Sequence, residues 1–326
     1  MPKSYIKNGI YRYKVNRPLS AEERYDHLPQ KKPSRSKPWY AKTVIRMNST
    51  FLECVDRVYA WRGGGTAIAI PGLFIPLSGM YMSLSIIFDY PSFTPEEKEG
   101  ALLAGIAVFL MCSAFLALLI WGLRLECFRH THYPTRFNRK TRMVHVFRPN
   151  GTVLSVPWDN IFFTLGAQSM GLWEVLGHIL SEDGKTVLDT FPLSTRDDRD
   201  DSDPRTTLYQ HWEFVRRYME EGPEKLAGQV AKVWPIDERK EDFFDGLERI
   251  FANFPTFIWI IAFPVAPSFF CAAIGRWIAM RTCKIPRWPA EVEAESEFDP
   301  DDPYIRDRYS LADRYEAEAI EKDLRA

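Results

Sequence analysis

Two long uncharged runs constrain this chain more than any other feature of its sequence. Gly64–Phe88 and Ala101–Leu123 contain 25 and 23 residues, and neither holds a charged side chain. A helix rises about 1.5 Å per residue and the hydrocarbon core of a bilayer is about 30 Å thick, so each run is long enough to cross it. Only Asp89–Gly100 separates the runs, and it is rich in charge. The sequence therefore predicts a transmembrane hairpin, with a kink in the first helix at Pro71 and Pro76.

The distribution of basic residues predicts how this hairpin sits. Residues 1–63 contain fourteen Lys and Arg against five Asp and Glu, and six more basic residues lie between Arg124 and Arg142. The loop between the two runs is acidic instead. Lys and Arg near the ends of membrane helices favour the cytoplasmic side. We therefore expect a multi-pass protein whose N-terminus and residues 124–250 are cytoplasmic, with the loop on the far side of the membrane.

The segment before the hairpin is expected to lack a core of its own. Residues 1–45 are rich in Lys, Arg, Pro and Ser without a sustained period, which predicts an extended or disordered segment. From Val44 to Tyr59 the apolar residues fit a helical period. That pattern predicts an amphipathic helix lying along the membrane interface and leading into the first span.

After the second run the pattern changes to the period of two that is typical of strands. Met143–Phe147 and Thr152–Val156 flank Asn150-Gly151, a dipeptide that favours a type I′ hairpin turn. Leu172–Leu180 and Thr186–Leu193 flank a second turn at Asp183-Gly184. We expect two antiparallel hairpins in this region.

One further strand and a helix complete the predicted domain. Leu125–Phe137 can supply a strand leaving the membrane, and Thr207–Glu221 has the apolar spacing of a helix. Five strands and a terminal helix resemble the small curved sheet of pleckstrin-homology-like domains, an analogy of fold that carries no function. The fold class we predict is a membrane protein, an α-helical transmembrane hairpin with a cytoplasmic α+β domain built on a small antiparallel sheet.

A third apolar region, Ala252–Gly275, is interrupted by three prolines and followed by cations. The cations predict that the residues after this region are cytoplasmic, and the domain before it is also expected to be cytoplasmic. One straight span would put the two on opposite sides of the membrane. We favour a re-entrant hairpin that turns at residues 264–267 between half-helices Phe251–Phe263 and Ser268–Met280. The alternative is a kinked single span with an external tail.

These patterns together predict five regions. They are a basic N-terminus at 1–45, an amphipathic helix and two-span hairpin at 46–123 with spans at 64–88 and 101–123, a cytoplasmic α+β domain at 124–222, a linker and proline-interrupted membrane region at 223–289 that includes 252–280, and an acidic tail at 290–326.

No motif in the sequence predicts catalysis. His130, His132 and His145 could hold a Zn²⁺ ion if two strands brought them together, but no further ligand has a matching spacing, and polar surface is the favoured interpretation. There is no nucleophile elbow, phosphate loop or dinucleotide fingerprint. The acidic run 197–203 lacks the pattern of a calcium loop, and no cysteines are paired as C-x-x-C. We expect no enzyme activity, no catalytic, cofactor or metal site, and no cofactor.

The composition also bears on transport and nucleic acids. The apolar runs contain no ionisable side chain, whereas carriers and pumps usually place some there. The basic residues lie on no recognisable nucleic-acid reading motif. We therefore expect neither transport nor binding to nucleic acid.

Several short stretches resemble a known family. They are Arg136–Lys140 before a strand, Val156–Asp159, Arg276–Arg281 and Pro286–Val292. With the two spans, they resemble DUF6708, a domain-of-unknown-function family of proteobacterial membrane proteins, over about Lys42–Glu297. The resemblance implies a product encoded beside type VI secretion effectors, an immunity or accessory protein, and supplies no catalytic residues.

The function we predict is therefore binding at the bacterial inner membrane. The expected partners are the lipid bilayer and a secreted effector or toxin protein, which the chain would neutralise or assist in type VI secretion. The alternative is a membrane-anchored structural or regulatory module whose pleckstrin-homology-like domain recruits a cytoplasmic partner or a lipid. The sequence alone leaves both open.

Overall fold

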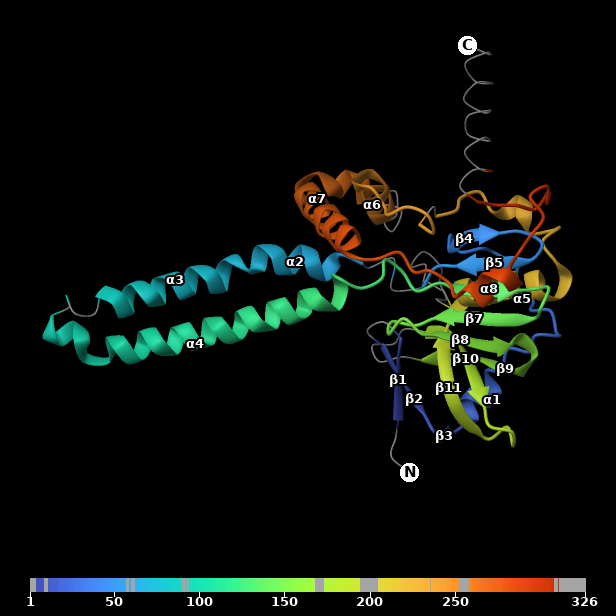
Figure 1. The fold of residues 1–326 in the computed structure, drawn as a ribbon, viewed down its shortest axis with the longest axis horizontal. Coiled ribbons are helices and arrows are strands. Elements are labelled where there is room, and N and C mark those ends of the chain that lie inside the picture. Colours follow the sequence, from blue (N-terminus) through green and yellow to red (C-terminus); the bar gives the residue numbers. More distant parts are fainter. Residues whose placement is uncertain are drawn as a thin grey trace, which may run out of the picture. The chain divides into compact units, whose positions relative to one another are not determined.

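The computed structural model describes most of the chain (Figure 1). The described residues are 4–8, 11–56, 59, 62–89, 92, 94–167, 173–193, 205–234, 236–251, 258–307 and 310. The chain divides into two compact units. The first comprises Met1–Tyr59, His130–Lys240 and Ile285–Ala326, and the second comprises Ala60–Arg129 and Glu241–Lys284. The chain thus leaves the first unit twice and returns to it twice.

Antiparallel strands build the first unit. A five-stranded sheet runs in sequence order through β4 (Val44–Met47), β5 (Phe51–Cys54), β6 (Thr135–Asn138), β7 (Met143–Phe147) and β8 (Val153–Pro157). A four-stranded sheet has the order β3 (Arg17–Pro18), β11 (Thr186–Pro192), β10 (Trp173–Leu180) and β9 (Ile161–Ala167). A separate pair is formed by β1 (Ser4–Asn8) and β2 (Tyr11–Val15), and the short helices are α1 (Ala21–Tyr25) and α8 (Ala290–Glu295).

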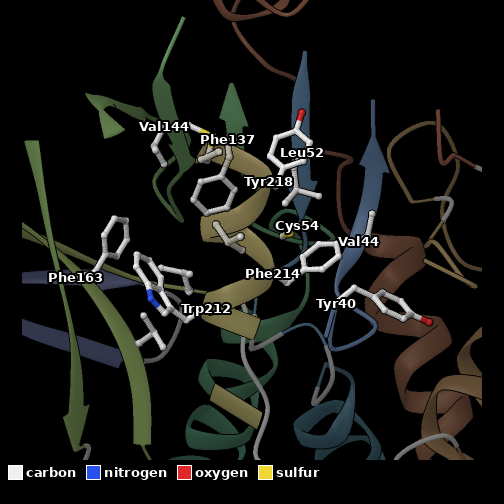
Figure 2. Close-up of a cluster of buried hydrophobic side chains, with 14 of the residues drawn as sticks. Tyr40, Val44, Leu52, Cys54, Phe137, Val144, Phe163, Trp212, Phe214 and Tyr218 are labelled. Carbon is white, nitrogen blue, oxygen red and sulfur yellow. The ribbon is translucent and has the colours of Figure 1, made fainter. Parts of the chain in front are cut away.

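Helix α5 (Arg205–Glu221) supplies one side of the core of this unit. Its Trp212 stacks on Trp158 at a centroid distance of 5.8 Å and meets Phe163 of β9 at 4.6 Å. Figure 2 shows Trp212 on the side of Phe163, with Phe214 and Tyr218 farther along the same cluster. Burying aromatic side chains of this size contributes much of the stability of such a core. The helix predicted at Thr207–Glu221 is confirmed.

The predicted hairpins of the middle region are also confirmed. Strand β7 pairs with β8, and β10 pairs with β11, around the turns at Asn150-Gly151 and Asp183-Gly184. The type I′ conformation is wrong for the first turn, because Gly151 has a φ of 84° whereas Asn150 has no positive φ. The Asn150 side chain instead accepts hydrogen bonds from the backbone N–H and the hydroxyl of Thr152. The loop is longer than two residues, so only its glycine needs the left-handed region.

The amphipathic helix predicted at Val44–Tyr59 is wrong, because β4, β5 and the turn between them occupy Val44–Cys54. Asn48 turns the chain between them by accepting hydrogen bonds from the backbone N–H groups of Thr50 and Phe51. Strand β5 is buried on both faces. A strand buried on both faces shows no alternation, so its apolar run can imitate a helical period.

The N-terminal segment is more ordered than predicted. The extended part of the prediction agrees with β1, β2 and β3, but the described residues between 11 and 45 do not form a disordered tail. Ser20 and Glu23 form a capping box at the start of α1, and β3 pairs with β11. The hydroxyl of Tyr13 donates to Glu174 at 2.7 Å. These partners lie far away in the sequence, so local composition did not reveal them.

The second unit is helical. Its helices are α2 (Gly64–Gly72), α3 (Phe74–Asp89), α4 (Pro95–Glu126), α6 (Phe243–Phe251) and α7 (Ile258–Thr282). Helix α3 packs against α4, and α2 packs against both α4 and α7. The break between α2 and α3 at Leu73 lies between the two prolines that predicted a kink. Two stretches, Gly64–Asp89 and Gly100–Glu126, are long and apolar enough to cross a membrane.

Residues 252–257 of the third apolar region lie outside the described residues, and over 258–280 neither prediction agrees with the structure. Helix α7 continues through Pro264 and Pro267, so no re-entrant turn lies at residues 264–267. Each proline removes only one backbone donor, which a long apolar helix can tolerate. The external tail is also wrong, because the described residues 285–307 return to the first unit. There, for example, Asp302 accepts a hydrogen bond from the Ser49 hydroxyl at 3.0 Å.

Candidate functional site

The first unit contains a cavity of about 290 Å³ with charged walls. The lining residues come from β4, from β5, from β6 and the segment just before it, from residues 237–238, and from residues 286–293, which include the start of α8. The lining residues are Arg46, Glu53, His132, Arg136, Asp237, Glu238, Pro286, Arg287, Trp288 and Glu293.

A buried ion pair forms one wall of the cavity. Glu53 of β5 and Arg136 of β6 are direct neighbours in the strand register. The Arg136 Nε donates to Glu53 Oε2 at 2.8 Å, and both residues are 4% exposed. Because charges are costly to bury alone, each of these side chains depends on the other.

Two aromatic rings and a second carboxylate also contact the guanidinium group of Arg136. Its guanidinium lies over the ring of Phe51 at 4.5 Å and over the ring of Trp288 at 4.9 Å. It also donates to Glu293 of α8 at 3.1 Å. The indole Nε1 of Trp288 donates to Glu53 Oε2 at 3.2 Å. Burial by itself would lower the pKa of Arg136, but the attraction of Glu53 and the contacts with Glu293 raise it overall.

A second group of charges lies at Arg46 of β4. Its guanidinium contacts Asp237 at 2.9 Å and Glu238 at 3.2 Å. Burial raises the pKa of Asp237, and Arg46 opposes that rise. Arg287 lines the same cavity and is exposed. The cavity therefore presents both signs of charge, with an indole beside them, which suits a polar ligand or an interacting side chain better than an apolar molecule.

The three histidines weighed as zinc ligands have different surroundings. The ring of His130 packs edge-on against Phe147 with centroids 5.0 Å apart. His132 Nδ1 contacts the Thr131 hydroxyl at 2.9 Å, and His145 Nδ1 contacts the Ser155 hydroxyl at 2.8 Å. Burial, together with the nearby Arg136, lowers the pKa of His145 to about 4. Among the described residues, no group of three or more His, Cys, Asp or Glu side chains could hold a metal ion.

The cysteines do not pair with one another. All five are free, and Cys127 is buried with its Sγ 3.6 Å from the Thr66 hydroxyl in the second unit. The acidic run 197–203 lies outside the described residues.

No local sequence motif marks Glu53, Arg136 and Trp288 as a group. A signal was present, because Glu53 is the one charged residue within the strand Phe51–Cys54, which is buried on both faces. A carboxylate in such a strand needs a cationic partner. The partner lies 83 positions away in the chain, and only the pairing of β5 with β6 identifies it.

One known protein family matches more than half of this chain. The family described as a family of unknown function, DUF6708, matches residues 112–300 of its 326 residues. The chain belongs to the DUF6708 family. The match confirms the family resemblance seen in the sequence and includes Arg136, Trp288 and Glu293 of the cavity. No curated protein and no solved structure matches this DUF6708 chain, so its likeness to pleckstrin-homology-like domains stays a prediction.

Proposed function

We propose that this DUF6708 chain is a multi-pass protein of the bacterial inner membrane that acts by binding. The observation that carries the proposal is the exposed apolar surface of Gly64–Asp89 and Gly100–Glu126. Only 11% of the most apolar part of the first stretch, and 6% of that of the second, is buried inside the protein. Their exposed large side chains include Ile68, Phe74, Ile75, Met82, Phe88, Leu103, Leu110, Met111 and Leu118. A helix that is apolar all round needs either a protein core or lipid around it.

The topology of the first unit supports two crossings. Cys54 at the end of β5 pairs with Thr135 at the start of β6, and the hairpin is inserted between them. The inserted segment must therefore start and end on the same side of a membrane, so its number of crossings is even. The basic residues around its two ends favour the cytoplasm for that side.

Binding is a better account of the first unit than catalysis. Charges of its cavity are engaged in ion pairs with one another, as in the buried Glu53–Arg136 pair and the half-buried Arg46–Asp237 pair. A catalytic group would have to leave such a pair before it could act on a substrate. An anchored domain also has a high effective concentration toward anything that arrives at the membrane.

We further propose that the partner is a secreted effector of a type VI secretion system, which this protein neutralises or assists. The support is the resemblance to DUF6708 and the anchored architecture. The second candidate is a regulatory module whose sheet domain recruits a cytoplasmic protein or a lipid headgroup. The mixed charges of the cavity suit a protein partner in either case.

Thiol labelling tests the orientation. In a Cys271→Ser background, which removes the exposed native thiol, single cysteines replace Thr94 in the loop and Glu182 in the β10–β11 turn. An impermeant thiol reagent should label position 94, but not 182, in cells whose outer membrane has been opened. Labelling of position 182 alone would show that the orientation is the reverse of the one proposed. Labelling of both positions in unlysed cells would show that no membrane separates the loop from the β10–β11 turn.

Coexpression tests the partner. The candidate toxin encoded beside this gene is expressed with the full chain, and with a Leu110→Lys/Leu118→Lys variant whose α4 can no longer enter lipid. Growth restored by the full chain but not by this variant supports anchored neutralisation. If neither protects against any neighbouring product, neutralisation fails. Capture of a cytoplasmic protein by the full chain, lost in an Arg46→Glu/Arg287→Glu variant, would then favour the recruitment module.

A further inference from the structure

Helix α7 is long and apolar, yet the path of the chain does not let it cross a bilayer alone. The residues before it, up to Lys240, and those after it, from Ile285, both belong to the first unit. A single crossing between them would place parts of one folded unit on opposite sides of the membrane. A second crossing would have to be made by residues 241–257. In the described part of that stretch, 241–251, helix α6 spans only about 14 Å, less than half of the hydrocarbon core, and five of the eleven residues are charged.

The contacts of α7 gather at the foot of the hairpin, where α2 begins and α4 ends. A Cβ atom at Gly275 would lie 2.5 Å from Ala67, so the backbones of α7 and α2 meet closely there. The Cys283 thiol donates to the carbonyl oxygen of Glu126 at 3.1 Å, and the N–H of Lys284 donates to the carbonyl oxygen of Arg129 at 2.7 Å. These partners lie at the ends of the predicted spans, which is the level of the membrane surface.

A buried ion pair holds α7 to the start of the α6 segment. Arg276 Nε donates to Glu241 Oε2 at 2.8 Å, and Arg276 also donates to the carbonyl oxygen of Arg62 at 3.1 Å. The ring of Phe243 packs against Phe270 at 5.3 Å. The C-terminal half of α7 is therefore fixed beside Arg62, where the chain enters the second unit. A helix descending through the lipid would carry these residues away from that point.

The second half of α7 has two distinct faces. Ala273, Arg276, Ala279, Met280 and Cys283 are buried in the second unit. The opposite face exposes Phe270, Ile274 and Trp277 at helical spacing, followed by the exposed cations Arg281 and Lys284. An exposed apolar stripe that ends in tryptophan and is followed by basic residues suits the headgroup region of a membrane.

We propose that α7 is an interfacial helix that lies flat in the cytoplasmic leaflet. Its Phe270–Ile274–Trp277 stripe faces the acyl boundary, and Arg281 and Lys284 face anionic phospholipid headgroups. The proposal rests on the proposed anchoring of the hairpin, and it adds a second lipid-binding surface that does not span. Such helices bury their apolar face by about 5–10 Å. The protein then enters the membrane with two crossings and one surface helix.

Spin-label depth measurements test this assignment. The full chain is reconstituted in vesicles of phosphatidylethanolamine and phosphatidylglycerol, with one label per variant. Native Cys271 and an Arg281→Cys variant in a Cys271→Ser background report on α7, since the other four cysteines are buried. Leu110→Cys and Ile120→Cys, also in the Cys271→Ser background, form a matched pair on α4 with the same spacing of ten residues. Accessibility to oxygen and to a water-soluble nickel complex gives the depth of each label.

An interfacial helix places both α7 labels at the same shallow depth, whereas the α4 labels differ by about 15 Å along a crossing helix. A depth difference of that size between positions 271 and 281 would overturn the proposal, because α7 would then penetrate the bilayer. Water exposure of both α7 labels would overturn it too, in favour of a protein-covered or solvated face. If the α4 pair shows no depth difference, the anchoring itself fails instead.

Discussion

At the scale of single residues, the Glu53–Arg136 pair predicts a large loss of stability when one of its charges is removed. Glu53→Gln leaves the Arg136 guanidinium buried at 4% exposure without its principal counter-charge. Breaking a buried pair in this way costs roughly 3–5 kcal/mol, so the variant should unfold at clearly lower denaturant concentration. Denaturant titration of the detergent-solubilised protein, followed by tryptophan fluorescence, measures the change.

The matched control is Lys31→Ala, which breaks the exposed contact between Lys31 and Asp159. Exposed pairs contribute about 0–1 kcal/mol, so this variant should stay close to the wild type. Equal effects of the two substitutions would show that the cavity wall is solvated rather than buried.

A second expectation at this scale concerns pH. His211 of α5 is fully buried, and burial lowers its pKa from 6.5 to about 4. In the unfolded chain the His211 imidazole is therefore protonated as the pH falls below about 6.5, whereas in the folded chain it is protonated only near pH 4. Stability should fall as the pH drops through this window, by up to about 3 kcal/mol from this residue. A His211→Leu variant should flatten the pH dependence of the unfolding midpoint between pH 7 and 4; an unchanged slope would contradict the expectation.

At the scale of elements, the β7–β8 turn depends on one glycine. Gly151 has a φ of 84°, a conformation that a β-branched residue adopts only with strain. Gly151→Val should destabilise the first unit by about 1–3 kcal/mol. Thermal unfolding of this variant is compared with Gly228→Ala in the same unit, where an added Cβ has no atom within 4 Å. A Gly151→Val chain as stable as the control would show that the turn relaxes.

The same scale shows what the sequence could and could not predict. Strands β8 and β11 have exposed positions, and clear turn residues join β7 to β8 and β10 to β11, so local pattern located all four. Strand β5 is buried on both sides and pairs with a strand from beyond the hairpin. The cavity combines Glu53, Arg136 and Trp288 from three distant segments. Such a site forms only when strands that are distant in the sequence pair in the correct register, as β5 does with β6. No local sequence motif specifies that register.

At the scale of the whole molecule, the proposed anchoring predicts fractionation. The full chain should remain with membranes after alkaline carbonate extraction, because its apolar helices would otherwise expose side chains such as Leu110 and Leu118 to water. Leu110→Lys/Leu118→Lys should release it from the membrane fraction, whereas Lys31→Ala should not. Quantitative blotting of the fractions measures this. Release of the wild-type chain by carbonate would reject the anchor.

The insertion of the hairpin between β5 and β6 also sets the order in which the protein can be made. Residues 55–134 must leave the ribosome before Thr135 can pair with Cys54. At roughly 5–20 residues per second, this delay is about 4–16 s. During that interval β5 is paired with β4 alone and lacks its second neighbour β6, and Glu53 lacks Arg136. For an anchored chain, the hairpin reaches the translocation machinery within the same interval. Completion of the sheet then follows membrane insertion, and a failed insertion leaves an unpaired strand edge for quality-control proteases to recognise.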